Sequence, residues 1–139
     1  MSNLEKAKDI LNNSEYTCVL CSDSETITSS KRGVAPLLEW YEQSMTLSEF
    51  SAADKVVGKG AAFLYILLNI GELHANVISI HALETLRQHN VKATYSVLAD
   101  AIRNRDNTGF CPIETAVMDI SEPVSALKAI KEKLEMMKK

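Results

Sequence analysis

The sequence predicts an α/β three-layer sandwich in which helices cover both faces of a mixed β-sheet. Three patterns support this prediction: a β-hairpin near the N-terminus, a strand–helix–strand unit in the second half, and amphipathic or fully apolar helices around them. The chain has 139 residues, 46% of them hydrophobic, and no linker or internal repeat divides it. We therefore expect a single domain over residues 1–139 with one main core.

The first third of the chain predicts a helix, a hairpin and a second helix. Apolar residues recur at helical spacing from Asn3 to about Asn13. The segments Tyr16–Cys21 and Thr26–Ser30 are rich in β-branched and small residues, and the polar residues between them suit a turn, so they indicate a hairpin. A broad apolar face over Val34–Ser44, with a proline in its first turn, predicts the second helix.

The segment from Ala52 to Asn69 predicts the central helix. Ser51 precedes it and Asp54 follows three residues later, a spacing that resembles a capping box. The second half of the segment is apolar on every side, which is typical of a helix buried in the middle of a domain.

The second half of the chain predicts a β-α-β unit and then helices. Its strands are Ala75–Ile80 and Lys92–Val97, with a helix over His81–His89 between them. A right-handed crossover makes the two strands parallel neighbours. Three helices are expected to follow, over Leu98–Asn104, Pro112–Asp119 and Glu122 to about Met137.

The last predicted helix carries one apolar stripe. Such a stripe usually packs on the domain's own core, and in the alternative it forms the interface of a homo-oligomer. Its members are Leu127, Ile130, Leu134 and Met137.

Charge and cysteine content exclude several classes of protein. A net charge of −3 and a pI of about 5.6 lack the basic surface of a dedicated nucleic-acid binder. The longest strongly apolar stretch, Ala61–Ile70, is about half the length of a membrane span, and the first residues show no signal pattern. The three cysteines are sparse and odd in number, which suits a reducing compartment. We expect a cytoplasmic protein with no nucleic-acid or membrane partner.

The segment Asp54–Gly60 contains the main candidate site. Two lysines and two glycines interrupt the first turns of the predicted central helix, where Lys55 and Lys59 would repel each other at the positive end of the helix dipole. Gly58 allows a ligand to approach the backbone. We therefore expect Asp54, Lys55, Gly58 and Lys59 to bind a small anionic or nucleotide-like ligand. In the alternative, local carboxylates pair with the lysines and the glycines admit a neighbouring element.

Cys111 and Glu114 form a second candidate site. Pro112 suits a first helical position, so Cys111 lies at or next to a predicted N-cap, where backbone N–H groups stabilise a thiolate. With Glu114 as a nearby proton acceptor, the pair suggests a thiol enzyme or a redox sensor. In the alternative, Cys111 is a buried structural residue and Glu114 closes a capping box.

Several single residues are weaker candidates. Arg105 is expected to bind an anion or to complement the carbonyls of a helix end, and Arg32 offers a similar cation in a loop. His81 follows a strand end, where sites often form. Cys18 and Cys21 lie on a predicted strand and point to opposite faces, which argues against a zinc or redox pair.

Together with the order of the elements, four segments resemble an uncharacterised prokaryotic family, the domain of unknown function 1893 (DUF1893) family. They are Arg32-Gly33-Val34-Ala35-Pro36-Leu37, Asp54-Lys55-Val56-Val57-Gly58-Lys59, Val77-Ile78-Ser79 and Cys111-Pro112-Ile113-Glu114. The resemblance spans about Leu4 to Asp119. It implies a fold of the cytidine deaminase-like superfamily.

The zinc motifs of that superfamily are missing. Zinc deaminases carry His/Cys-x-Glu at the start of the helix after the hairpin and Pro-Cys-x-x-Cys at the start of the helix after the next strand. At the corresponding places stand Asp54-Lys55 and Ile80-His81-Ala82-Leu83-Glu84, which supply at most one carboxylate and one imidazole. Catalytic zinc needs three protein ligands. We therefore expect no metal, no other cofactor and no zinc-dependent deamination.

By analogy with that fold, a ligand cleft would persist without its metal. Its walls would be the start of the central helix and the ends of the parallel strands. The expected contacts are cations, one acceptor and a polar wall: Lys55, Lys59, Arg105, Asp54, and Ser79 or His81. The thiol enzyme and a non-catalytic oligomeric or regulatory module are the alternatives.

Overall fold

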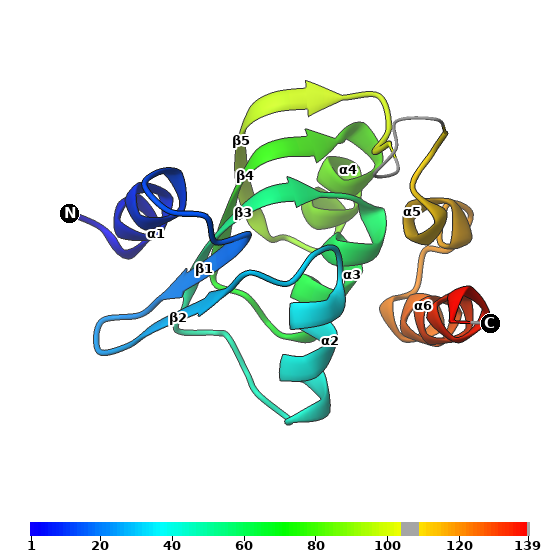
Figure 1. The fold of residues 1–139 in the computed structure, drawn as a ribbon, viewed down its shortest axis with the longest axis horizontal. Coiled ribbons are helices and arrows are strands. Elements are labelled where there is room, and N and C mark those ends of the chain that lie inside the picture. Colours follow the sequence, from blue (N-terminus) through cyan, green and yellow to red (C-terminus); the bar gives the residue numbers. More distant parts are fainter. Residues whose placement is uncertain (104–108, 139) are drawn as a thin grey trace.

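A five-stranded mixed sheet runs through the middle of the molecule, with the strand order β2-β1-β3-β4-β5 (Figure 1). The computed structural model describes residues 1–103 and 109–138. In these residues the strands are β1 (Cys18–Cys21), β2 (Thr26–Ser29), β3 (Ser51–Val57), β4 (Glu72–Ser79) and β5 (Lys92–Ala99). The helices are α1 (Asn3–Asn12), α2 (Ala35–Glu42), α3 (Lys59–Leu67), α4 (Ile80–Gln88), α5 (Pro112–Ala116) and α6 (Pro123–Met137).

The predicted mixed sheet is confirmed. β1 is antiparallel to both of its neighbours, β2 and β3, whereas β3, β4 and β5 are parallel to one another. The β1–β2 hairpin and the β4-α4-β5 unit are the two patterns from which the sheet was predicted. Ser79 ends β4 and caps α4, because its Oγ accepts a hydrogen bond of 3.0 Å from the Ala82 N–H.

The prediction of one helix over Ala52–Asn69 is wrong in its first third. Ser51–Val57 forms β3, which is paired with β1 on one side and β4 on the other, and α3 begins only at Lys59. The backbone hydrogen bonds of this segment to two neighbouring strands outweigh its weak local preference for a helix. Ser51 is therefore a strand residue rather than a cap. Gly58, with extended backbone, is the N-cap of α3.

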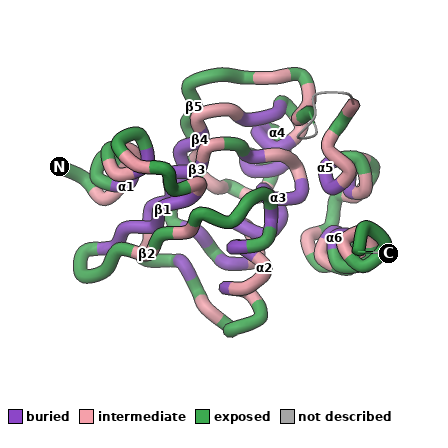
Figure 2. The backbone as a smooth tube through the Cα atoms, in the orientation of Figure 1, coloured by how far each residue is buried: buried purple, intermediate pink, exposed green. Residues whose placement is uncertain are grey.

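Helices cover both faces of the sheet, as predicted. α1 packs on one face, where Ala7, Leu11, Val19, Cys21 and Ala53 form a small apolar cluster. The main core lies on the other face, beneath α2, α3 and α4 (Figure 1). Every residue from Gly60 to Tyr65 in α3 is buried, which confirms the central helix. The burial is concentrated in β1, β3, β4 and α3, whereas the edge strand β5 is mostly exposed (Figure 2).

The C-terminal part differs from the prediction at one helix. Leu98 belongs to β5 rather than to a helix, and Asn104 lies outside the described residues. α5 and α6 pack against each other and against α3, so α3 is covered on its outer side as well. In α6, Ile130 is buried and its stripe neighbours pack on the main core, except that Met137 is 52% exposed.

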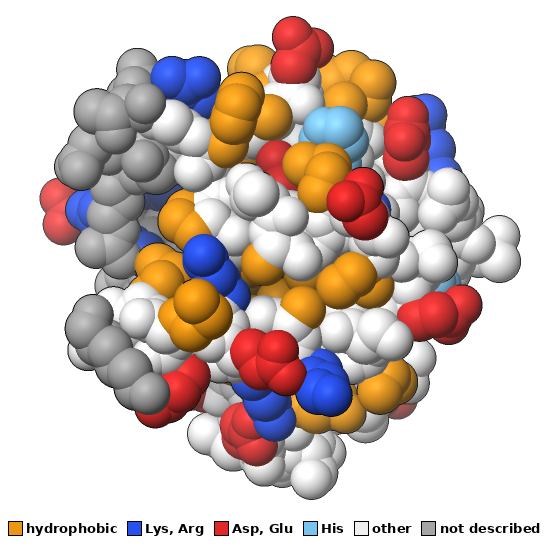
Figure 3. Space-filling view, turned by 90° about the vertical axis from the view of Figure 1, so that its right-hand side faces the viewer, with side chains coloured by type: hydrophobic (Ala, Val, Ile, Leu, Met, Phe, Trp, Pro, Cys, Tyr) orange, Lys and Arg blue, Asp and Glu red, His pale blue; other side chains and the backbone are white. Residues whose placement is uncertain are grey.

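The outer surface mixes apolar and charged side chains. On the face shown in Figure 3, apolar groups are distributed among charged and polar ones. Phe110, Val124 and Met136 are among the exposed large apolar residues. None of the helices within residues 1–103 and 109–138 combines the length and the apolar character that crossing a membrane requires.

Candidate functional site

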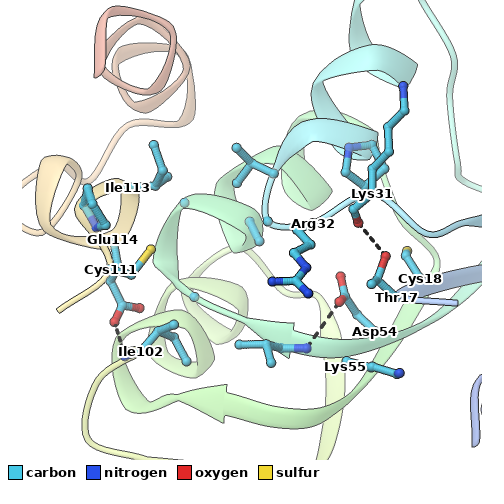
Figure 4. Close-up of a pocket in the computed structure, with 18 of the residues that line it drawn as sticks. Thr17, Cys18, Lys31, Arg32, Asp54, Lys55, Ile102, Cys111, Ile113 and Glu114 are labelled. Carbon is cyan, nitrogen blue, oxygen red and sulfur yellow. Dashed lines mark hydrogen bonds between the residues drawn. The ribbon is translucent and has the colours of Figure 1, made fainter. Parts of the chain in front are cut away.

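A cavity of about 650 Å³ lies where the carboxyl end of β3 meets the first turns of α2 and α3. The α5 segment forms the facing wall (Figure 4). The lining comes mainly from residues 17–18, 31–34, 36, 54–56, 58, 60–61, 102–103 and 111–114. The carboxyl ends of parallel strands are the usual place for ligands in open α/β sheets. The cavity is therefore the candidate site within the part of the chain that the structure describes.

Asp54 is a buried carboxylic acid in the wall of this cavity, with 8% of its surface exposed. The Tyr65 O–H donates to its Oδ2 at 2.6 Å, and the Val56 N–H donates to its Oδ1 at 3.3 Å. Burial raises the pKa of Asp54 from 3.8 to about 7, against the opposing effect of these hydrogen bonds. The carboxyl therefore populates both of its protonation states near neutral pH.

Tyr65 and Cys18 extend the hydrogen bonding behind Asp54. Tyr65 is fully buried in α3, and its Oη lies 3.2 Å from the Cys18 Sγ on β1. Burial, together with the nearby Asp54 charge, raises the pKa of both Tyr65 and Cys18 well above their ordinary values, so both stay protonated. Cys18 faces the main core and Cys21 the α1 cluster, which confirms that they point to opposite faces.

Sequence reasoning did not find Tyr65 as a site residue. The available signal is a tyrosine in the otherwise apolar run of the central helix. A buried phenol needs a hydrogen-bond partner, so such a residue indicates a polar group inside the core. It does not indicate which group.

Arg32 is an exposed residue at the cavity, and it is one of four basic residues that line it, with Lys31, Lys55 and Arg103. Its side chain extends into the space on the side where Asp54 lies (Figure 4). Gly33 follows with φ +63°, a left-handed conformation that turns the chain into α2. α2 begins without a side-chain cap at Val34. Its first N–H groups therefore add positive potential to the same wall.

Glu114 is a buried carboxylate that ties three segments together. It is 2% exposed and accepts hydrogen bonds from the Lys59 N–H (2.7 Å), the Ser79 O–H (2.5 Å) and the Ile102 N–H (2.8 Å). It does not close a capping box, because the Cys111 N–H donates to the Ile102 carbonyl instead. The anion expected at the head of the central helix is therefore supplied by the chain itself.

Lys55 and Lys59 do not share a helix face. Lys59 is the first residue of α3, and its ammonium donates to the Met118 carbonyl at 2.7 Å. Lys55 lies in β3, where alternation places its side chain on the opposite face of the sheet from Asp54. Figure 4 shows its amine turned away from Arg32. The expected lysine pair was wrong because Ser51–Val57 is a strand.

Cys111 is the N-cap of α5, as predicted, and its half-buried side chain lines the cavity (Figure 4). The glycines at the start of α3 allow α5 to pack there. A Cβ on Gly60 would lie 2.6 Å from Ile113 Cγ2, and one on Gly58 would lie 3.2 Å from the Glu114 carboxylate. The glycines thus admit a neighbouring element, as the alternative interpretation expected.

The other predicted residues either do not line the cavity or lie outside the residues that the structure describes. Ser79 is fully buried and bonded to Glu114. His81, the second residue of α4, is half-buried and does not line the cavity. Arg105 lies outside the described residues.

In the sequence prediction, the two zinc motifs were placed at the wrong helix starts, namely at Asp54-Lys55 and at Ile80–Glu84. The helix after the hairpin is α2, and the helix after the next strand is α3. Their first residues, Ala35-Pro36-Leu37 and Lys59-Gly60-Ala61-Ala62, contain no zinc ligand. Across residues 1–103 and 109–138, no three or more His, Cys, Asp or Glu side chains gather in a way that could hold a metal ion.

Comparison with known proteins gives a family. The family model described as "TM1506: Domain of unknown function (DUF1893)" matches residues 6–134. The chain is also similar to the crystal structure of a DUF1893 family protein (TM1506) from Thermotoga maritima, with a TM-score of 0.87 and 24% sequence identity. This match covers 96% of this chain and 91% of that chain, and it shows a shared fold. No curated protein matches the chain. Since the family model spans nearly the whole sequence, the protein belongs to the DUF1893 family.

Proposed function

We propose that the protein binds a small anionic, nucleotide-like molecule in the cavity between α2, α3 and α5. The observation that carries this proposal is the position of Arg32, whose guanidinium extends into the cavity from a turn that directly precedes an uncapped helix. A guanidinium and a helix N-terminus both favour phosphate or carboxylate groups.

The dimensions and lining of the cavity support a ligand of this kind. A volume of about 650 Å³ falls in the range of roughly 300–1,000 Å³ that is typical of small-molecule sites. Apolar side chains from several elements line it, including Val34, Ile102 and Ile113. Asp54 adds one polar group at a fixed position. An apolar cavity with few fixed polar groups is the usual form of a specific binding site.

The positions of two helix starts support a cytidine deaminase-like fold as part of the proposal. The zinc motifs of that superfamily stand at the starts of two helices, and in this chain the starts of α2 and α3 both line the cavity. The ligand would thus occupy the place of the deaminase substrate. Zinc-dependent deamination is not proposed, because those helix starts carry no zinc ligand.

The other two hypotheses have less support. Cys111 lines the cavity, but the three hydrogen bonds that Glu114 accepts engage the carboxylate that a thiol mechanism would use as its base. The apolar stripe of α6 packs mainly on the domain's own core, around Ile130, which leaves less of it for an oligomeric interface.

Replacing Arg32 with glutamine is expected to weaken ligand binding by at least tenfold, or about 1.4 kcal/mol, because it removes the charge that faces the anion. We would screen nucleoside monophosphates, sugar phosphates and small oxo acids by thermal shift, and then titrate each compound that stabilises the wild type. Arg87→Gln is the matched control, since Arg87 is exposed at the end of α4. Equal stabilisation of wild type and Arg32→Gln, or none by any compound, would contradict the proposal.

A further inference from the structure

We propose that the cavity is also a catalytic site, in which Asp54 removes a proton from a bound small anion and returns it to another atom of the same molecule. The inference rests on the proposed function, because it requires the anion to be held by Arg32. The substrate class is a small carboxylate or phosphate ester in which a C–H bond lies next to a carbonyl group. The reaction class is a proton shift within one molecule, as in an isomerase or tautomerase.

The position of Asp54 meets the geometric requirement for a general acid–base group. The residue lies in the cavity wall at the end of β3, with its carboxyl directed to the same side as Arg32 (Figure 4). Oδ2 is held by the short hydrogen bond from Tyr65, whereas Oδ1 accepts a longer bond of 3.3 Å from the Val56 N–H. Oδ1 is therefore the more available oxygen for a substrate proton.

The groups around Asp54 also suit both directions of proton transfer. Cys18 faces it from β1, Tyr65 from α3, and Arg32 from the turn before α2. Lys55, the next residue of β3, places its side chain on the other face of the sheet. Burial brings the pKa of Asp54 to about 7, so the carboxylate that accepts a proton and the acid that donates one coexist at neutral pH.

The proposed reaction is balanced without a further reactant. The C–H bond breaks, its proton moves to Asp54 Oδ1, and its electron pair moves into the carbonyl group to give an enolate. The Arg32 guanidinium stabilises the negative charge in this apolar space. The enolate is then protonated by Asp54 at a different atom, which regenerates the carboxylate. No oxidant, reductant or second substrate is required.

Tyr65 acts in this scheme as a positioning residue. Its O–H fixes the carboxyl plane through Oδ2, and this hydrogen bond lowers the pKa of Asp54 relative to burial alone. Tyr65→Phe is therefore expected to raise the pKa of Asp54, and so to move the pH dependence of proton transfer upward. A residue with a purely structural role would lower stability without moving the midpoint.

Hydrogen–deuterium exchange tests the inference with a simple probe, 2-oxobutyrate, dissolved in D₂O with the intact protein. Proton NMR would follow the loss of the C3 proton signal, and saturation transfer from the protein would show in the same sample whether the probe binds. We expect exchange on the order of 100-fold faster with wild type than with Asp54→Asn, the scale of general-base catalysis. Asp119→Asn is the control, since Asp119 is exposed and does not line the cavity.

The outcomes separate the two proposals. Binding of the probe without protein-dependent exchange, or equal exchange by wild type and Asp54→Asn, would overturn the catalytic role. Absence of saturation transfer would contradict the binding of small oxo acids, which the catalytic inference requires, and would leave the nucleotide arm of the thermal-shift screen to decide the proposed function. Exchange that depends on Asp54, with a midpoint that rises in Tyr65→Phe, would support both the acid–base role and the positioning role.

Discussion

Replacing Glu114 with alanine is expected to lower the free energy of unfolding by about 4 kcal/mol, because it removes the acceptor of three hydrogen bonds at once. Each buried donor left without a partner costs roughly 1–3 kcal/mol. Two of the three donors are backbone N–H groups of Lys59 and Ile102, which cannot rotate toward another acceptor. Urea denaturation followed by circular dichroism measures the change.

Two further variants make this prediction specific. Glu114→Gln keeps the size of the side chain but has one acceptor oxygen, so we expect about half of the loss. Glu84→Ala is the matched control, because Glu84 is an exposed carboxylate on α4, and its removal is expected to change stability by less than about 0.5 kcal/mol. A loss below about 1 kcal/mol in Glu114→Ala would show that the carboxylate does not hold α5 against the starts of α3 and α4.

The free energy of unfolding of Asp54→Asn, measured relative to that of wild type, is expected to be about 3 kcal/mol higher at pH 8.5 than at pH 4.5. The pKa of Asp54 is 3.8 when unperturbed and about 7 in the folded protein. Between these values the folded state holds a proton that the unfolded chain has released. The contribution of the Asp54 carboxyl to the free energy of unfolding is therefore greatest below pH 4, and it is lost as the pH rises through 7. Asparagine has no charge to bury, so the free energy of unfolding of the variant does not fall in this way at high pH.

The comparison between two pH values removes packing effects that do not depend on pH. Asp119→Asn serves as the control at both pH values, since Asp119 is exposed and its neutral analogue should show no such difference. Chemical denaturation gives the four free energies that are needed. An Asn variant with the same relative stability at pH 4.5 and pH 8.5 would show that Asp54 does not titrate in the neutral range. A stabilising substitution at a functional residue is a common trade-off.

Much of the fold could be predicted because its patterns are local. The hairpin, the β4-α4-β5 unit and the buried half of α3 each depend on neighbouring residues and on simple periodicity. The strand Ser51–Val57 could not be found in this way. Its alanines and lysine fit a helix as well as a strand, and it becomes a strand because β1 and β4 pair with it from distant parts of the sequence.

Only part of the candidate site could be predicted, because its other contacts also join distant parts of the sequence. The strain at the head of the central helix did indicate an anion, but the anion is Glu114, which lies 55 residues from the Lys59 N–H that it binds. Asp54 was identified as a polar group of the site, whereas its buried partner Tyr65 and the inward direction of Arg32 depend on tertiary packing. No spacing in the sequence encodes these long-range contacts.

The most direct measurement is a pH titration of the Asp54 carboxyl carbon by NMR, with Asp54→Asn used to assign its signal. Because the side chain is buried and lines the cavity, we predict a midpoint near pH 7. A midpoint near pH 4, the ordinary value for an aspartic acid, would contradict the neutral-range carboxyl and remove the basis for acid–base chemistry at this site.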